Sequence, residues 1–175
     1  MQIQIFKSFR PTDQKLYDEI LSVTQPVSEI YPEYNQWFRN VFLPGLKCGQ
    51  RMCIVARDEN KKLAGCALVK KTPEEQKICT LYIRPEFRRQ GTGRTLMRET
   101  MQELDCLPLM TVSQKQIPQF TKLLKEFGFR LSSVRKRSEK TNELEFYFND
   151  KKAELIQKGL IPVLRYRLQD LEHIH

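Results

Sequence analysis

The stretch LYIRPEFRRQGTGRTLM, residues 81–97, decides the fold of this chain. It starts with strand-like apolar residues, passes through four arginines and two glycines, and ends in a helix-like run. A basic turn would need only the arginines. A site that binds an anion through its backbone also needs the glycines, because they let the main chain come close to the ligand. The stretch therefore predicts a strand, an anion-binding loop and a helix.

The glycines of this loop, Gly91 and Gly93, stand just before the expected helix. Backbone N–H groups would converge there, and the helix N-terminus would add its partial positive charge. Two better-known phosphate loops are excluded, because neither G-x-x-x-x-G-K-[ST] nor G-x-G-x-x-G occurs in the sequence.

The full string is Pro85-x-x-Arg88-x-x-Gly91-x-Gly93, placed between the strand-like TLYI and an amphipathic helix. It resembles motif A of the GNAT superfamily, the acetyl-CoA-dependent N-acetyltransferases. The order of the expected elements from Ile3 to Asn149 is also similar to that family. The resemblance implies an α/β GNAT fold with a central mixed, mostly antiparallel sheet of about six to seven strands flanked by helices.

The resemblance also implies a set of cofactor contacts. The strand would run beside the pantetheine arm and point a backbone amide at the thioester carbonyl. Backbone amides of the loop would bind the pyrophosphate. The residues concerned are Leu81, Tyr82, Ile83, Arg88, Arg89, Gln90, Gly91, Thr92, Gly93 and Arg94. Acetyl-CoA is thus the expected co-substrate, and no metal is expected.

The catalytic acid and base are less clear from the sequence. Many GNAT enzymes have a tyrosine four residues before a Gly-Phe pair, and this chain has Leu124 at that place. Ser113 stands where some relatives carry an acid, and Tyr147 could supply a phenol, although a packing role competes with that interpretation. Ser113 and Tyr147 are therefore the candidate catalytic residues.

Elements on either side of the motif complete the expected domain. Residues 1–9 and 51–71 predict a strand and a hairpin, and a helix should begin near Thr12 or Asp13. A second helix should end at Pro44 and Gly45 and place one face toward the core, with Tyr34, Trp37, Phe38, Val41 and Phe42. After the motif helix, LMTVS, a further helix and two strands are expected. We predict one domain over residues 1–175, with a core at about 3–149 and an extension at 150–175.

Composition limits the partners. The net charge of +9 indicates an anionic partner, and coenzyme A accounts for part of it. Five cysteines without a C-x-x-C pair predict reduced, mostly buried thiols rather than disulfides or a zinc site, and only His173 and His175 are histidines. We expect a cytoplasmic protein without membrane contact, we do not expect a nucleic-acid partner but leave it open, and a homodimer also stays open.

Three functions remain. The first is transfer of an acetyl group from acetyl-CoA to a primary amine, on a small molecule or a protein, by direct attack. The second is an acetyltransferase acting on aminoacyl-tRNA, which the basic charge favours and Leu124 disfavours. The third is a non-catalytic GNAT-fold module that binds acyl-CoA or an anionic partner.

Overall fold

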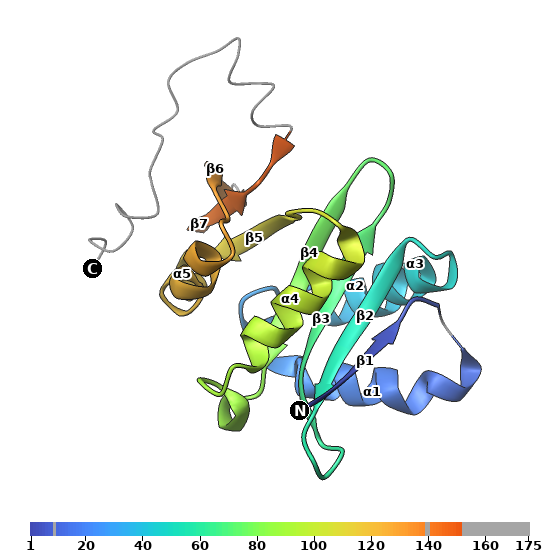
Figure 1. The fold of residues 1–175 in the computed structure, drawn as a ribbon. Coiled ribbons are helices and arrows are strands. Elements are labelled where there is room, and N and C mark those ends of the chain that lie inside the picture. Colours follow the sequence, from blue (N-terminus) through green and yellow to red (C-terminus); the bar gives the residue numbers. More distant parts are fainter. Residues whose placement is uncertain (9, 139–140, 152–175) are drawn as a thin grey trace. The chain divides into compact units, whose positions relative to one another are not determined.

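The computed structural model describes residues 1–8, 10–138 and 141–151. The two histidines and nearly all of the expected extension at 150–175 lie outside these ranges. The chain divides into two compact units, residues 1–106 and 107–175 (Figure 1). Each unit is described by itself, and a single domain over the whole chain stays a prediction.

The first unit is built on four strands that follow one another in space as in sequence. They are β1 (Gln2–Phe6), β2 (Arg51–Arg57), β3 (Leu63–Lys71) and β4 (Gln76–Ile83), and every neighbouring pair is antiparallel. The middle residues of β2 and β3 are buried without alternation. Strands of this kind need both faces of the sheet covered, and helices cover them here.

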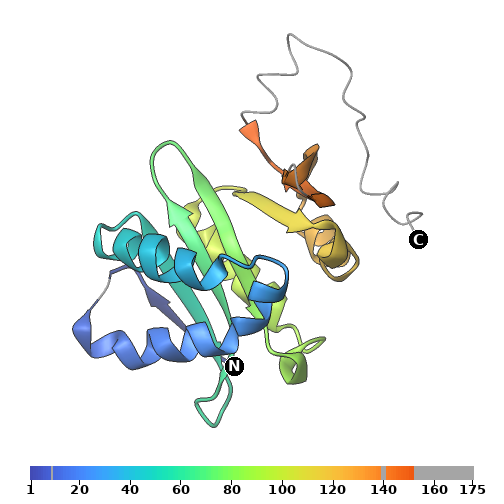
Figure 2. The ribbon, with the colours of Figure 1, turned by 180° about the vertical axis from the view of Figure 1, so that it is seen from behind.

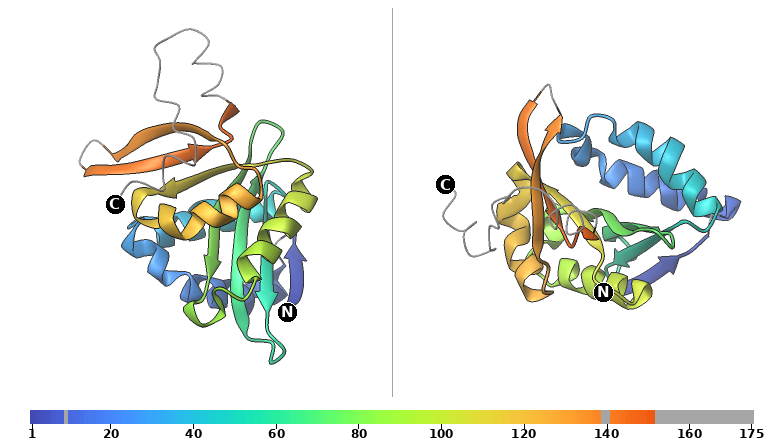
Figure 3. Two further views of the ribbon diagram at one scale, coloured as in Figure 1. Left: turned by 60° about the vertical axis from the view of Figure 1, so that its left-hand side comes forward. Right: turned by 90° about the horizontal axis from the view of Figure 1, so that it is seen from above.

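Helices lie on both faces of this sheet (Figures 2 and 3). One face carries α1 (Gln14–Val23), α2 (Tyr34–Trp37), the π-helical turn η3 (Phe38–Phe42) and α3 (Leu43–Lys47), and it packs around Tyr17, Ile20, Phe38, Phe42 and Leu46. The other face carries α4 (Thr92–Leu104). The short 3-10 turns η1 (Pro11–Asp13), η2 (Gln25–Glu29) and η4 (Pro85–Phe87) join these elements.

The predicted end of the second helix is wrong. The helical path continues through Pro44 and Gly45 to Lys47. Pro44 is tolerated because it lies at the first turn of α3, where its backbone nitrogen needs no hydrogen. The wider π turn also changes which residues face inward, so Val41 is exposed instead of buried.

The second unit contains β5 (Leu109–Ser113), the turn η5 (Gln114–Gln116), α5 (Ile117–Glu126), β6 (Leu131–Ser138) and β7 (Thr141–Phe148). β7 pairs antiparallel with both β5 and β6. Its core includes Leu124, Phe129 and Phe148. Gly128 follows α5 in the left-handed conformation, with φ of 72°, as the expected stop signal requires.

The predicted α/β class with mostly antiparallel strands and flanking helices is confirmed. All five cysteines are free, but only Cys53 and Cys66 are buried, so the expectation of mostly buried thiols holds in part. In the part of the chain that the structure describes, no helix has the length and apolar character needed to cross a membrane.

Candidate functional site

β4, the strand that leads into the glycine loop, has an irregularity in its pairing with β3. Leu68 of β3 pairs with Thr80, but the next residue, Val69, pairs with Ile78. Cys79 is therefore an extra residue in β4, a β-bulge. A bulge bends its strand and leaves a residue out of the hydrogen-bond ladder. The strand predicted to lie along the pantetheine arm is thus distorted within two residues of Leu81.

The end of β4 is packed between two layers. The ring of Tyr82 packs against the core under α1 and α2. Ile83 faces the other way, because a Cβ added at Gly93 of α4 would lie 3.3 Å from its Cδ1 atom. Gly93 thus lets the start of α4 come close to β4, which places the helix N-terminus beside the end of the strand.

The loop between β4 and α4 turns through two left-handed residues. Arg89 has φ of 59° and Gly91 has φ of 84°. The left-handed conformation costs a residue other than glycine about 1–2 kcal/mol, so Arg89 is held there by the surrounding loop. Gly91 is the N-cap of α4, and it offers no side chain to bond the first N–H groups of the helix. Such a start is typical of helices that bind anions.

Three side chains fix this loop by donating to backbone carbonyl oxygens. Arg88 Nε donates to Ile83 at 3.0 Å, Gln90 Nε2 donates to Glu86 at 2.8 Å, and Thr92 Oγ1 donates to Phe87 at 3.2 Å. These side chains therefore bind the carbonyl groups of the loop. Carbonyl groups held in this way are not turned toward an anion, and the N–H groups at the start of α4 are left to bind it.

The charge around the loop is positive. Arg88, Arg89 and Arg94 are all exposed. The nearby acid, Glu86, is paired with Lys62 at 3.1 Å and with Arg84 at 2.9 Å. Its own backbone amide and Lys62 hold the pKa of the Glu86 carboxyl below its usual value. Glu86 is therefore ionised but neutralised, and the exposed arginines set the field at the loop.

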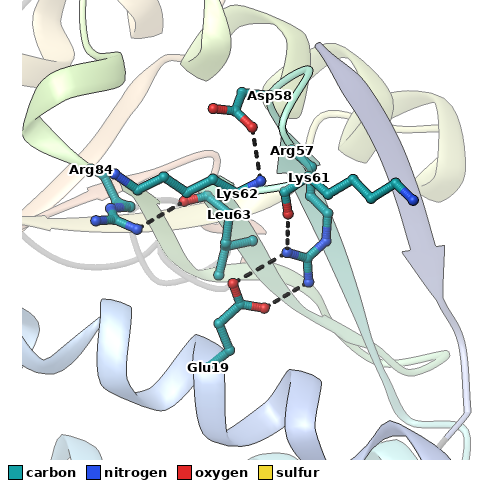
Figure 4. A network of polar contacts seen from close by, with 7 residues as sticks. All are labelled: Glu19, Arg57, Asp58, Lys61, Lys62, Leu63 and Arg84. Atoms are coloured by element: carbon teal, nitrogen blue, oxygen red, sulfur yellow. Dashed lines mark hydrogen bonds and ion pairs between the residues drawn. The ribbon is translucent and has the colours of Figure 1, made fainter.

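A polar network fixes the C-terminal end of β4 (Figure 4). Arg57 at the end of β2 donates to both carboxylate oxygens of Glu19 on α1, at 2.7 and 3.2 Å, and to the carbonyl of Lys61 at 2.8 Å. Arg84 follows β4 and donates from its backbone N–H to Ala64 at 3.0 Å. The network ties the β2–β3 hairpin to α1 and to the first residue after β4.

A cavity of about 510 Å³ lies on the α1 side of β4. It is lined by residues of α1 and η2 together with Tyr82, Arg84 and Glu86. Ile83 and Gly93 are in contact on the opposite side of the strand. The first unit therefore carries a loop suited to an anion at the end of β4 and a cavity beside it.

The ten predicted cofactor residues lie in the first unit, and the two predicted catalytic residues lie in the second. All ten predicted cofactor contacts lie on β4 or in the loop and first turn of α4. Ser113 and Tyr147 lie in the second unit. Ser113 pairs with Glu145, and Thr111 pairs with Tyr147, so the two candidates share one face of adjacent strands.

The surroundings of the two catalytic candidates differ. The Ser113 hydroxyl is buried and has no hydrogen-bond partner within the described residues. Tyr147 donates its hydroxyl to Glu145 at 3.3 Å, and the guanidinium carbon of Arg135 lies 4.2 Å from its ring centre. Burial raises the pKa of Tyr147 above its ordinary value, so the phenol keeps its proton at neutral pH.

Other candidate chemistry is weaker. Leu124 is completely buried and offers no acid. Burial raises the pKa of the Cys79 thiol, so the reactive thiolate is disfavoured. Among the residues that the structure describes, no cluster of histidine, cysteine or acidic side chains could hold a metal ion.

The sequence interpretation missed Gly65 and the cavity. A Cβ added at Gly65 would lie 2.6 Å from the carbonyl oxygen of Tyr82, so this glycine sets the spacing of β3 and β4. An isolated glycine within a strand pattern was an available signal for such a close approach. No pattern in the sequence indicated the cavity, because its walls come from segments far apart in sequence.

This geometry defines an α/β protein with a glycine-containing loop, suited to an anion, between a bulged strand and a helix. A model of the acetyltransferase (GNAT) domain matches residues 49–131, which include the bulged strand, the loop and α4. Residues 49–131 are therefore similar to the family that the motif predicted. No curated protein sequence matches it.

Solved structures share the fold at low sequence identity. The ribosomal-protein-S18-alanine N-acetyltransferase from Escherichia coli has a TM-score of 0.59 and 18% identity, over 84% of this chain and 92% of that one. An aminoglycoside 6′-N-acetyltransferase complexed with coenzyme A has a TM-score of 0.62 and 11% identity, over 85% and 95%. A protein described as a streptothricin acetyltransferase from Bacillus anthracis, in complex with acetyl coenzyme A, has values of 0.54 and 15%, over 62% and 66%.

Proposed function

We propose that this protein is an N-acyltransferase that moves the acetyl group of acetyl-CoA to a primary amine. The observation that carries the proposal is the start of α4. Gly91 is a left-handed N-cap without a side chain, and the neighbouring carbonyl groups are bonded by Arg88, Gln90 and Thr92. Such a loop suits a pyrophosphate, and the match to the GNAT domain supports acetyl-CoA as its source.

The reaction is a direct attack. The amine nitrogen forms a bond to the thioester carbonyl carbon, the carbon–sulfur bond breaks, and coenzyme A leaves as a thiolate. The amine loses one proton and the thiolate gains one. A backbone amide of Leu81, Tyr82 or Ile83 would stabilise the developing oxyanion. No covalent enzyme intermediate is needed, which agrees with the raised pKa of Cys79.

The two candidate catalytic residues keep their roles as proposals. A tyrosine phenol is protonated at neutral pH and can give its proton to a departing thiolate, which is the role proposed for Tyr147. Ser113 would act through a hydrogen bond, because a serine hydroxyl does not serve as a strong base without a partner. The cavity lined by Tyr82 and Glu86 would admit part of a ligand from the α1 side of β4.

A second candidate is a module that binds acyl-CoA without catalysis. It is favoured by Leu124, which fills the position of the family's tyrosine and is fully buried. By contrast, the structure offers less support for a nucleic-acid substrate. Arg135 pairs with Asp150, and Arg137 pairs with Glu143, so part of the positive charge on β6 is already neutralised.

Binding of acetyl-CoA is the first test. Ligand at 100 times its dissociation constant should stabilise the protein by about 2.7 kcal/mol, seen as a rise in Tm. Gly91→Glu should abolish the rise, because the carboxylate would occupy and repel the anion site. Gly49→Glu is a matched control, since Gly49 is also left-handed and a Cβ there would meet nothing within 4 Å. No rise at millimolar acetyl-CoA in the unaltered protein would contradict the proposal.

Catalysis is the second test. Free thiol released from acetyl-CoA would be followed with polyamines, amino acids, peptides and aminoacyl-tRNA as acceptors. Acceptor-dependent release that Gly91→Glu abolishes and Gly49→Glu keeps would support the transferase. Acetyl-CoA binding without release for any acceptor would favour the binding module.

A further inference from the structure

Arg51, the first residue of β2, is held on three sides. Its guanidinium carbon lies 5.5 Å from the ring centre of Trp37, and its Nη1 donates to the sulfur of Cys79 at 3.4 Å. A Cβ added at Gly45 would lie 2.8 Å from its Cδ and 2.9 Å from its Nε. The stacking on Trp37 and the hydrogen bond to Cys79 therefore fix one orientation of the guanidinium. Gly45 leaves room for that orientation because it has no side chain.

No carboxylate balances this fixed charge. In the ranges 1–8, 10–138 and 141–151, Arg51 takes part in no ion pair, although Arg57 on the same strand pairs with Glu19. A guanidinium has five N–H donors, and the sulfur of Cys79 accepts one of them only weakly. Arg51 is half-buried, and within the described residues its remaining donors have no hydrogen-bond acceptor.

Two lysines extend the positive charge across the sheet. Arg51 lies directly opposite Lys70 of β3, and Lys70 lies directly opposite Lys77 of β4. Glu75, paired with Lys70 at 2.8 Å, is the single acid bonded to this row within the described residues. Like charges directly opposite one another destabilise a sheet unless an anion compensates them. The row therefore favours a bound anion.

The position of the row separates this anion from the phosphates of coenzyme A. Arg51 reaches β4 at Cys79, the bulged residue, whereas the anion-binding loop follows Ile83. At about 3.3 Å per residue, Cys79 and Ile83 are roughly 13 Å apart along the strand. The row thus reaches β4 two residues before Leu81, the first residue that the proposed function places along the thioester, and before the loop proposed for the pyrophosphate.

We propose that the acceptor is an amino acid, and that Arg51 binds its carboxylate while the amine is acetylated. The inference rests on the proposed function. The planar fork of a guanidinium matches the two oxygens of a carboxylate, and stacking on Trp37 uses the face of the guanidinium rather than its N–H groups. Lys77, which has no ion-pair partner within the described residues, would add a second attraction.

The experiment compares free amino acids with their amides, which keep the amine and lose the carboxylate charge. α-, β- and γ-amino acids would each be assayed with the matching amide by thiol release from acetyl-CoA. The unaltered protein should prefer at least one acid over its amide by roughly 10- to 100-fold in kcat/KM. Arg51→Met should bring that ratio close to one, and Arg51→Lys should keep part of it.

Controls keep the result interpretable. Arg39→Met removes an exposed arginine from the neighbouring turn η3 and should leave the ratio unchanged. If Arg51→Met does not fold, Arg51→Lys tests the same ratio, because it retains the charge and loses the fork. The Tm rise with acetyl-CoA should be the same in the unaltered protein and in both Arg51 variants.

The outcomes separate the two proposals. Absence of any Tm rise with acetyl-CoA overturns the proposed function, and this inference with it. A normal rise with no amino acid acetylated, or with amides used as well as acids, overturns the inference alone. An acid-to-amide ratio that neither Arg51 variant lowers does the same.

Discussion

Gly65 on β3 and Tyr82 on β4 are so close that a side chain cannot be inserted between them. A Cβ at residue 65 would lie 2.6 Å from the carbonyl oxygen of Tyr82 and 3.2 Å from the Cα of Ile83. Both neighbours are backbone atoms, so they cannot rotate away as a side chain would. This contact fixes β4 at the end where the loop to α4 begins.

We predict that Gly65→Ala destabilises the protein by roughly 1–3 kcal/mol, the range typical of overpacked cores. The displaced segment of β4 carries residues proposed to contact acetyl-CoA, so the ligand-induced rise in Tm should also become smaller. Urea unfolding and thermal shifts with acetyl-CoA would measure the two effects.

Gly49→Ala serves as the comparison for this substitution. Gly49 has φ of 70° and open space around it, so alanine there meets strain in the backbone but no clash. We expect a loss of about 1 kcal/mol and an unchanged response to acetyl-CoA. Equal effects of the two substitutions on acetyl-CoA binding would show that the Gly65 contact does not position the site.

Stability should fall at alkaline pH because of buried thiols. Burial raises the pKa of Cys66 to about 12 from its ordinary value of 9.0. Below pH 9 the thiol is protonated in both states and has no effect. Between pH 9 and about 12 the unfolded thiol ionises and the folded one does not, so the free energy of unfolding falls by up to about 1.4 kcal/mol per pH unit.

Cys66→Ala should therefore give a shallower loss of stability above pH 9 than the unaltered protein, in urea unfolding under reducing conditions. A residual slope will remain, because burial also raises the pKa of Cys53, and raises that of Tyr17 to about 12. Cys48→Ala removes an exposed thiol and should leave the slope unchanged. Identical slopes for Cys66→Ala and Cys48→Ala would refute the explanation.

Ser113 should show opposite effects on stability and on turnover. Its buried hydroxyl has no partner within the described residues, so Ser113→Ala removes an uncompensated polar group. We expect a gain of about 1 kcal/mol in unfolding free energy. If the hydroxyl is catalytic, kcat should fall while binding of acetyl-CoA stays the same.

Tyr147→Phe completes this comparison. Loss of a general acid typically lowers the rate by 10²–10⁴-fold, and we expect an effect of at least about 10²-fold on kcat. The variant should keep the Tm rise with acetyl-CoA. Unchanged turnover in both variants would leave Ser113 and Tyr147 with packing roles only.

Local chemistry explains which features could be predicted. The strand before Pro85, the loop at Gly91 and the helix after it depend on residues within a few positions of one another, so their pattern was readable. The helix around Pro44 was predicted to end too early, because a π turn that only packing can stabilise precedes it. The place of Leu124 at the family's tyrosine position stays a prediction, whereas its complete burial came from the fold.

The sequence by itself determined the loop for which acetyl-CoA binding is proposed, since the backbone conformation of the loop follows from Gly91 and its neighbours. Only the tertiary structure decided the surroundings of Arg51. Its partners, Trp37, Gly45 and Cys79, lie on separate elements. The physical reason is that an anion-binding loop is built from consecutive backbone groups, whereas an acceptor pocket is built from side chains that packing brings together.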